Sequence, residues 1–250
     1  MALLQTENLS KSFGALAAVE GLTLAIEAGT LHSIIGPNGA GKTTLFNLLT
    51  GTFAPSSGEI FLEGRKITGA SAHRVAHLGI ARSFQRTNVF PAFSLADNVW
   101  VAAFATGASW KGLLWRQRHR YPEVAERARR ALGDVGLADK SHQLAREISH
   151  GEQRQLELAI ALAAEPRVLL LDEPVAGVPE GERQEIFESI NALPADVSVL
   201  LIEHDMDLVF SFAKRISVLV DGALMVEGEP AAIAADPRVR AVYLGESRDG

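Results

Sequence analysis

The order of apolar and polar positions predicts short strands in the front part of the chain. Leu22, Leu24 and Ile26 alternate with small or polar residues, which is the period of a half-buried strand. Leu31 to Ile35 predicts the next strand, and Leu45 to Leu49 predicts a helix that follows a glycine-rich loop. The front part therefore contains one strand–loop–helix unit beside antiparallel ribbons.

Two hairpins and two continuous apolar runs complete the strand pattern. Residues 59–67, with the turn Glu63-Gly64, predict one hairpin, and residues 217–226, with the favoured turn Asp221-Gly222, predict another. Val168 to Leu171 and Val197 to Ile202 are apolar runs of strand length. Such runs are typical of parallel strands that are covered on both faces.

The middle of the chain has a helical pattern instead. Glu123 to Leu132 predicts a helix with one charged face. No internal repeat or low-complexity linker interrupts the chain. The pattern therefore predicts a single α/β domain over residues 1–250, with a helical insertion at residues 88–160.

Composition narrows the class of protein without identifying it. The 250 residues are 47% hydrophobic and 22% charged, as in ordinary globular proteins. The formal charge of −6 argues against nucleic acid as a partner. The absence of cysteine excludes disulfides, thiolate zinc sites and cysteine nucleophiles. No apolar run approaches the roughly 18 residues of a membrane span, and we expect no signal peptide.

The glycine-rich segment carries the strongest chemical signal. It fits the pattern G-x-x-x-x-G-K-[ST], between an apolar strand and an apolar helix. Glycines let backbone N–H groups turn toward phosphate oxygens, and the helix N-terminus adds partial positive charge. Lys42 is expected to reach the β- and γ-phosphates, and the Thr43 hydroxyl to bind Mg²⁺. The segment consists of Gly36, Pro37, Asn38, Gly39, Ala40, Gly41, Lys42, Thr43 and Thr44.

Two carboxylates follow the apolar strand Val168 to Leu171. Ligands of parallel sheets bind at the carboxyl ends of strands. Asp172 is therefore the expected acidic partner of Mg²⁺, and Glu173 is placed to polarise an attacking water. Pro174 ends the strand, because it lacks a backbone N–H.

A second candidate anion site begins at Ser149. Ser149-His150-Gly151-Glu152 fits a capping box, and the helix is expected to run to Leu162 and to end before Pro166. By itself this is an ordinary helix start. The alternative is a second phosphate site that faces another subunit, since one chain needs only one γ-phosphate cradle.

Together these motifs resemble the ATP-binding subunit of an ABC transporter, over essentially the whole chain and in the expected order. The resemblance implies that Phe13 stacks on adenine and that the glycine loop is the Walker A motif. It further implies a Q-loop glutamine, a signature motif, a Walker B motif with a catalytic glutamate, and a switch histidine. The Q-loop glutamine corresponds to Gln85, the Walker B motif to residues 168–173 and the switch histidine to His204. The signature motif corresponds to Ser149, His150, Gly151, Glu152 and Gln153.

Several longer stretches resemble one branch of that family. ARSFQ, NVFPAFSLADNV, LDEPVAG, LLIEHDMDLV and DPRVRAVYLGE are similar to bacterial importers of branched-chain amino acids. SHGEQ with LDEPVAG also leans toward importers of urea or short amides. Both solute classes stay open at this point.

The resemblance implies a fold and a set of partners. The fold is a RecA-like P-loop sheet over residues 1–87 and 161–250, with an N-terminal antiparallel β subdomain, and an α-helical subdomain over residues 88–160. ATP and Mg²⁺ are the implied ligands, with Thr43, Gln85 and Asp172 at the metal. The implied catalytic residues are Glu173, His204, Gln85 and Lys42.

The implied partners are a second ABC ATPase subunit, two transmembrane permeases and, indirectly, a solute-binding protein. A heterodimer is favoured and a homodimer remains open. The implied location is the cytoplasmic face of the bacterial inner membrane. Gln85 would connect the nucleotide to residues 86–100, where Phe90, Phe93 and Trp100 would lie near the groove for a permease helix.

One segment and two departures from the family pattern stay open. Residues 107–121 hold two of the three tryptophans, and form either a cover of the domain edge or a contact surface. His150 replaces the commoner signature glycine, and Pro179 replaces an aspartate of the D-loop. The rival classes are an ABC protein of DNA maintenance, which needs long coiled coils absent here, and a P-loop metabolite kinase.

Overall fold

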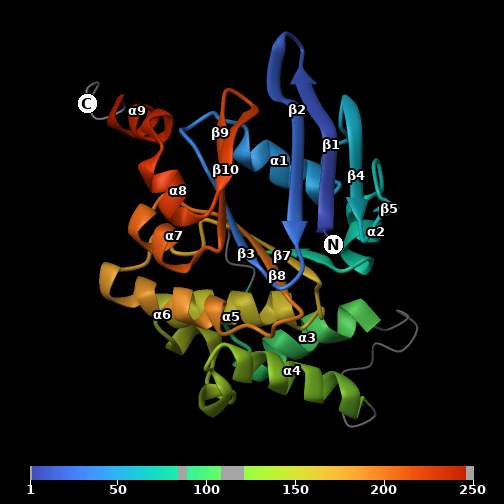
Figure 1. The fold of residues 1–250 in the computed structure, drawn as a ribbon. Helices are drawn as coiled ribbons and strands as arrows, with labels where there is room; N and C mark the ends of the chain where they lie inside the picture. The colour runs from blue at the N-terminus through green and yellow to red at the C-terminus, as the bar shows by residue number, and fades with distance from the viewer. Residues whose placement is uncertain (1, 84–88, 108–120, 246–250) are drawn as a thin grey trace.

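The computed structural model describes residues 2–83, 89–107 and 121–245, and contains two sheets that lie beside each other (Figure 1). The smaller sheet is antiparallel, in the order β2-β1-β4-β5. Leu22, Leu24 and Ile26 are buried in it, as their alternation predicts. Its strands are β1 (Ala2–Phe13), β2 (Leu16–Glu27), β4 (Ser57–Leu62) and β5 (Arg65–Lys66).

The larger sheet has the order β10-β9-β3-β8-β7-β6, and all its strands are parallel except β10. The apolar runs of the sequence form its central strands. The second predicted hairpin forms β9 and β10. The strands are β3 (Leu31–Ile35), β6 (Ile80–Arg82), β7 (Val168–Asp172), β8 (Ser198–Ile202), β9 (Arg215–Val220) and β10 (Ala223–Gly228).

Both faces of the larger sheet are covered, which explains why its strands are mostly apolar on both sides. Val168 and Leu170 pack in a core with α1 (Lys42–Leu49) and the antiparallel sheet. Leu169 and Leu171 face the opposite side and pack in a core with helices. Successive side chains of one strand therefore enter two different cores.

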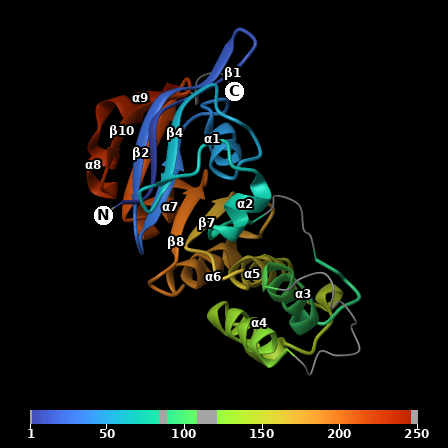
Figure 2. The ribbon, with the colours of Figure 1, turned by 90° about the vertical axis from the view of Figure 1, so that its right-hand side faces the viewer.

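Helices gather on the second face and below the sheet (Figures 1 and 2). In α4 (Pro122–Asp134), Val124, Ala128, Ala131 and Leu132 form the buried stripe of the predicted amphipathic helix. The other helices are α2 (Ala72–His77), α3 (Leu95–Gly107), α5 (His150–Leu162), α6 (Glu180–Asn191), α7 (Met206–Phe212), α8 (Pro230–Ala235) and α9 (Pro237–Gly245), with 3-10 turns η3 (Ala138–Lys140) and η4 (Ala145–Glu147).

This architecture confirms the predicted fold class: a parallel core sheet, an antiparallel β subdomain and an α-helical part inserted between β6 and β7. The exact subdomain boundaries stay a prediction. Within the described ranges, no helix has both the length and the apolar character needed to cross a membrane. Residues 108–120 of the tryptophan-containing segment lie outside the described residues.

Candidate functional site

Three neighbouring parallel strands end at the same edge of the larger sheet. β3 leads into the glycine loop, β7 leads into Glu173, and β8 leads into residues 203–205. Because β8 lies between β3 and β7, their carboxyl ends meet. Motifs far apart in the sequence are brought together by this strand order.

The glycines of the loop are required for two different physical reasons. Gly36 and Gly41 have φ values of 151° and 93°, and an added Cβ would lie 2.1 Å from the Leu219 oxygen or 2.2 Å from the Ala18 oxygen. Gly39 has a φ of 83° but faces open space. The first two positions therefore exclude any side chain, whereas Gly39 is required only by its backbone conformation.

Lys42 brings a positive charge to the start of α1. Its side chain is buried, and its Nζ donates to the carbonyl oxygens of Gly36 at 2.5 Å and of Pro37 at 2.9 Å. Gly41, the N-cap residue, adopts a left-handed conformation and makes no side-chain capping bond within the described part of the chain. The N-terminus of α1 and the ammonium group thus form a positive anion-binding cradle.

Glu173 and His204 face each other beside this loop. His204 Nε2 lies 3.1 Å from Glu173 Oε1. Glu173 has a φ of 53°, which is uncommon for a residue with a side chain. Its N–H donates to the Ile202 oxygen at 2.8 Å, which fixes the backbone from which the carboxylate projects.

Glu203 is a residue of the site that the sequence motifs do not identify. Its buried carboxylate accepts hydrogen bonds from the backbone N–H groups of Val175 (3.3 Å), His204 (2.7 Å) and Asp205 (3.4 Å). Burial raises the pKa of the Glu203 carboxyl, against the effect of these hydrogen bonds. Glu203 ties the loop that carries His204 to the loop that follows Glu173.

The loop from Asn38 to Thr44 lines one cavity together with Glu173 and His204; its volume of about 430 Å³ is within the size range of ligand pockets. Phe13 forms part of its wall; the ring packs on Phe53 with centroids 5.5 Å apart, and Lys11 Nζ lies 5.1 Å from the ring centroid. Ten of the predicted site residues meet in the cavity. They are Phe13, Asn38, Gly39, Ala40, Gly41, Lys42, Thr43, Thr44, Glu173 and His204.

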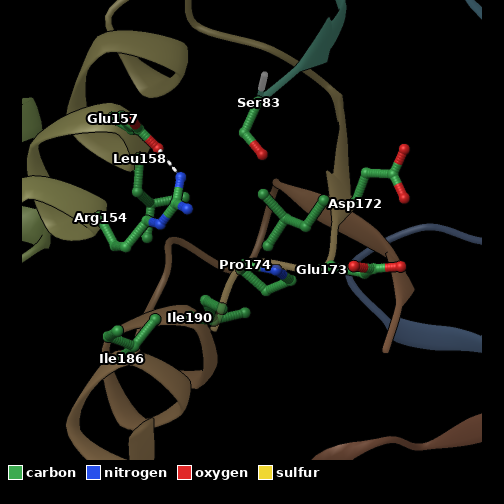
Figure 3. A pocket seen from close by; sticks show the side chains of 10 residues that line it. Ser83, Arg154, Glu157, Leu158, Asp172, Glu173, Pro174, Ile186 and Ile190 are labelled. Carbon is green, nitrogen blue, oxygen red and sulfur yellow. Dashed lines mark hydrogen bonds and ion pairs between the residues drawn. The ribbon is translucent and has the colours of Figure 1, made fainter. Parts of the chain in front are cut away.

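Asp172 lies beside the cavity rather than in its wall. It is buried, and its Oδ2 accepts from Arg82 Nη2 at 2.5 Å. Arg82 also donates to Asn47 Oδ1 at 2.7 Å, and so joins β6, β7 and α1. Oδ1 of Asp172 has no hydrogen-bond partner among the described residues. Figure 3 shows the carboxylates of Asp172 and Glu173 pointing away from Arg154 and Glu157.

Ser149 begins α5, and the predicted capping box is confirmed. Glu152 N donates to Ser149 Oγ at 3.2 Å, and Ser149 N donates to Glu152 Oε2 at 2.8 Å. An ion pair with Lys140 lowers the pKa of the Glu152 carboxyl, helped by the hydrogen bond from Ser149 N. Gly151 N donates to Glu182 Oε2 at 2.9 Å. None of these residues lines the cavity of the glycine loop.

The remaining predicted residues are placed as follows. His150 is exposed, and Gln153 Nε2 donates to the Ile148 oxygen at 3.4 Å. Pro179 is the exposed N-cap residue of α6. Gln85 falls within residues 84–88, outside the described part of the chain, so its predicted roles stay predictions.

The aromatic residues after Gln85 have unequal environments. Phe90 is half exposed, and its ring lies 5.1 Å from that of Phe93. Trp100 is buried and stacks on Phe104 at 5.0 Å. Trp100 is therefore part of the core of the helical region, and Phe90 offers the exposed ring.

The fold and this cavity define a P-loop nucleoside-triphosphate-binding protein. Residues 19–176 match the family model described as ABC transporter, and residues 224–249 match one described as branched-chain amino acid ATP-binding cassette transporter. The chain belongs to the ABC transporter family. This membership confirms the family and the ATPase class that the motifs predict.

Curated relatives and solved structures agree with this assignment. The chain is 39% identical to the high-affinity branched-chain amino acid transport ATP-binding protein BraF of Pseudomonas aeruginosa, covering 98% of both chains. It is 37% identical to the corresponding protein LivG of Escherichia coli, again covering 98% of each. The ADP conformation of an ABC transporter cassette superposes with a TM-score of 0.86, at 30% identity, covering 98% of this chain and 99% of that one.

Proposed function

We propose that this chain is the ATP-hydrolysing subunit of a membrane importer of branched-chain or related amino acids. The observation that carries the chemistry is the single cavity lined by the glycine loop, Glu173 and His204. The solute class is supported by the names of the relatives and by the match at residues 224–249. Urea or a short amide is the alternative solute.

The cavity has a polar and an apolar part that suit ATP. Lys42 and the N-terminus of α1 would stabilise the β- and γ-phosphates. The Phe13 ring, which is part of the same lining, would stack on adenine. Lys42 already makes hydrogen bonds to the loop carbonyls of Gly36 and Pro37, so phosphate binding would exchange these bonds for charge-assisted ones.

The residues beside the loop fit Mg²⁺. Asp172 Oδ1 is buried without a hydrogen-bond partner in the described ranges, and the Thr43 hydroxyl lies in the cavity wall. Oxygen donors of this kind are the ligands that Mg²⁺ prefers. Thr43, Asp172 and Gln85 would hold the ion, whose chemistry is to neutralise phosphate charge.

Hydrolysis needs an oriented water and a group that accepts its proton. Glu173 would orient the water in line with the γ-phosphate and accept the proton, while the bond from phosphorus to the β–γ bridging oxygen breaks. His204, 3.1 Å from Glu173, would hydrogen-bond the γ-phosphate. Glu203 would hold His204 in place through its backbone N–H.

The α5 start would act on a second nucleotide. Ser149 and Gly151 would contact the γ-phosphate held by the Walker A loop of another ABC subunit, with a heterodimer favoured. Two permeases would complete the complex at the cytoplasmic face of the membrane, with the exposed Phe90 near their docking groove. A solute-binding protein would deliver the solute.

The test uses Glu173→Gln, which should trap the ATP-bound closed state. The tagged variant is expressed in its native cell, membranes are solubilised with ATP and Mg²⁺, and co-purifying proteins are identified by mass spectrometry. We expect two permeases, a second ATPase subunit and at least a 100-fold loss of phosphate release, since a general base contributes about 10²–10⁴-fold.

Glu185→Gln, an exposed carboxylate of α6, is the matched control and should keep normal phosphate release. Recovery of only soluble proteins or nucleic acid would contradict the transport assignment. A phosphorylated metabolite instead of free phosphate would indicate a kinase. Uptake assays with branched-chain amino acids and urea decide between the two solute classes.

A further inference from the structure

The start of α5 is already occupied by a carboxylate of the same chain. Glu182, in the first turn of α6, accepts a hydrogen bond from Gly151 N at 2.9 Å and one from Ser149 Oγ at 3.4 Å. An added Cβ on Gly151 would lie 2.4 Å from Glu182 Oε2. The glycine at this position thus permits the close approach of an anionic oxygen.

The two donors that contact Glu182 are the ones that the proposed function assigns to the partner's γ-phosphate. A carboxylate oxygen and a phosphate oxygen both accept from N–H and O–H groups and both carry negative charge. They cannot share the Gly151 N–H at hydrogen-bond distance, and two anions so close repel each other. The phosphate therefore binds only after Glu182 has moved.

We propose that Glu182 is a positioning residue of the signature site: it holds the Ser149–Gly151 donors in place and competes with the incoming γ-phosphate of the partner subunit. This inference rests on the proposed function, because it presumes that the α5 start receives a phosphate. It adds Glu182 to that site, and it means that ATP-driven closure must supply the free energy needed to displace this carboxylate.

Displacement of Glu182 would reach the hydrolytic residues of its own chain. Glu182 lies in the first turn of α6, and the loop that precedes α6 starts at Glu173. α5 contacts the same loop, since Arg154 Nη2 donates to the Ala176 oxygen at 3.2 Å. Arg183, beside Glu182, donates from Nε to the Val178 oxygen at 2.9 Å. Binding of a phosphate at the α5 start is thereby linked to the loop that follows Glu173 in the hydrolytic site.

The contact itself is tested on the isolated full-length chain. In Glu182→Ala, the Gly151 amide proton resonance should move upfield, because the amide loses a charged acceptor. Glu180→Gln is the matched control: it is an exposed carboxylate of the same helical turn, makes no hydrogen bond to α5 in the described structure, and should leave the resonance in place. An unchanged resonance in Glu182→Ala overturns the proposal.

The role in closure is tested in the complete complex purified with Glu173→Gln. The measurement is the ATP concentration that gives half-maximal occlusion of radiolabelled ATP. Glu182→Gln keeps the shape but removes the charge, and should lower that concentration about tenfold, as expected for the loss of one charge-assisted competitor. Glu182→Ala should lower it at least as much, with thermal unfolding as the control for folding.

The outcomes separate the two levels of the proposal. If the Glu173→Gln complex occludes ATP but the Glu182 variants need as much ATP or more, Glu182 has no competing role and this inference is wrong. If the Glu173→Gln complex occludes no ATP, the two-subunit arrangement itself is wrong, and the inference falls with it.

Discussion

The chain contains two glycine-bearing helix starts that differ in how their N-termini are satisfied. α1 follows a buried strand through Gly41, without a side-chain capping bond in the described structure, and Lys42 adds positive charge. α5 is capped by Ser149 and Glu152, and Glu182 bonds the Gly151 N–H. A helix N-terminus attracts anions in both cases. The first is built to receive an anion, whereas the second is already satisfied by its own chain.

The difference lies in the neighbours rather than in the helices. The α1 start is surrounded by backbone carbonyls of β2 and β9, which force glycine at positions 36 and 41. The α5 start lies near the protein surface, where acidic side chains from α5 and α6 reach it. A binding site shaped by rigid backbone atoms keeps its geometry whether or not a ligand is bound. Displaceable side chains suit a site that is used only when another subunit arrives.

The largest contrast is expected from alanine at the two glycines. Gly41→Ala places Cβ 2.2 Å from the Ala18 oxygen at a φ of 93°, so the loop must distort. We expect ATP affinity of the isolated chain to fall about 1,000-fold, or about 4 kcal/mol. Gly151→Ala meets only the flexible end of Glu182, and should leave that affinity within about twofold.

Isothermal titration calorimetry measures both affinities, and circular dichroism checks that each variant folds. Lys42→Ala is a second variant of the loop, without the added Cβ, and should also weaken ATP binding strongly. Equal losses for Gly41→Ala and Gly151→Ala would break the distinction between the two helix starts.

A buried ion pair of the core sheet should contribute more to the free energy of unfolding than an exposed ion pair of the helical region. Arg82→Met leaves the buried Asp172 carboxylate without its charged partner, and should lower the free energy of unfolding by about 3 kcal/mol. Arg129→Met removes an exposed ion pair with Glu126 on α4, and should leave the free energy of unfolding nearly unchanged. Urea denaturation measures both changes.

A double variant sharpens this result. Asp172→Asn removes the charge that Arg82→Met leaves unpaired, so the double variant should be more stable than Arg82→Met alone. A double variant whose loss equals the sum of the single losses would show that the two side chains act independently.

The smallest of the three effects is a dependence of the free energy of unfolding on pH. It arises from a histidine in the strand that leads to the glycine loop. His32 of β3 is buried, and its Nε2 lies 2.8 Å from Ser217 Oγ. Burial lowers the pKa of His32 to about 4, against the attraction of Glu227 and with the repulsion of Arg215. In the unfolded chain, the pKa of His32 is near the ordinary histidine value of about 6.5.

The sign of the effect follows from this difference. Above the unfolded pKa both states are neutral; as the pH falls below it, the unfolded state gains a proton that the folded state refuses. Between pH 7.5 and 5, His32 should remove about 2 kcal/mol of stability. Urea denaturation at both pH values should show a smaller loss for His32→Gln than for the native chain. The exposed His142→Gln should keep the full loss, and an equal loss in His32→Gln would contradict the assignment.

The sequence predicts the parts of the site whose signals are local. The glycine loop, the carboxylates after Val168–Leu171 and the Ser149 capping box each occupy a few consecutive residues. Their chemistry follows from spacing alone, and strand order then brings the first two together with His204.

The sequence does not reveal residues whose partners are far away along the chain. Arg82 bonds Asp172, 90 residues later, and Glu182 bonds Gly151, 31 residues earlier. β1 also lacks a regular alternation of buried and exposed residues, and its pairing with β2 is interrupted by several register shifts. These features depend on packing, which spacing cannot show; Glu203 alone had a hint, as an acidic residue directly after an apolar strand.

The strand edges described above affect how this protein can associate. β5 has two residues and β6 has three, which are too short to template another chain. The longer edge strands, β2 and β10, meet at the hairpin turn, where Glu20 N donates to the Gly222 oxygen at 2.9 Å. Because few long strand edges are left open, strand-by-strand pairing with another chain is disfavoured, and a partner subunit would be recognised through loops and helix ends.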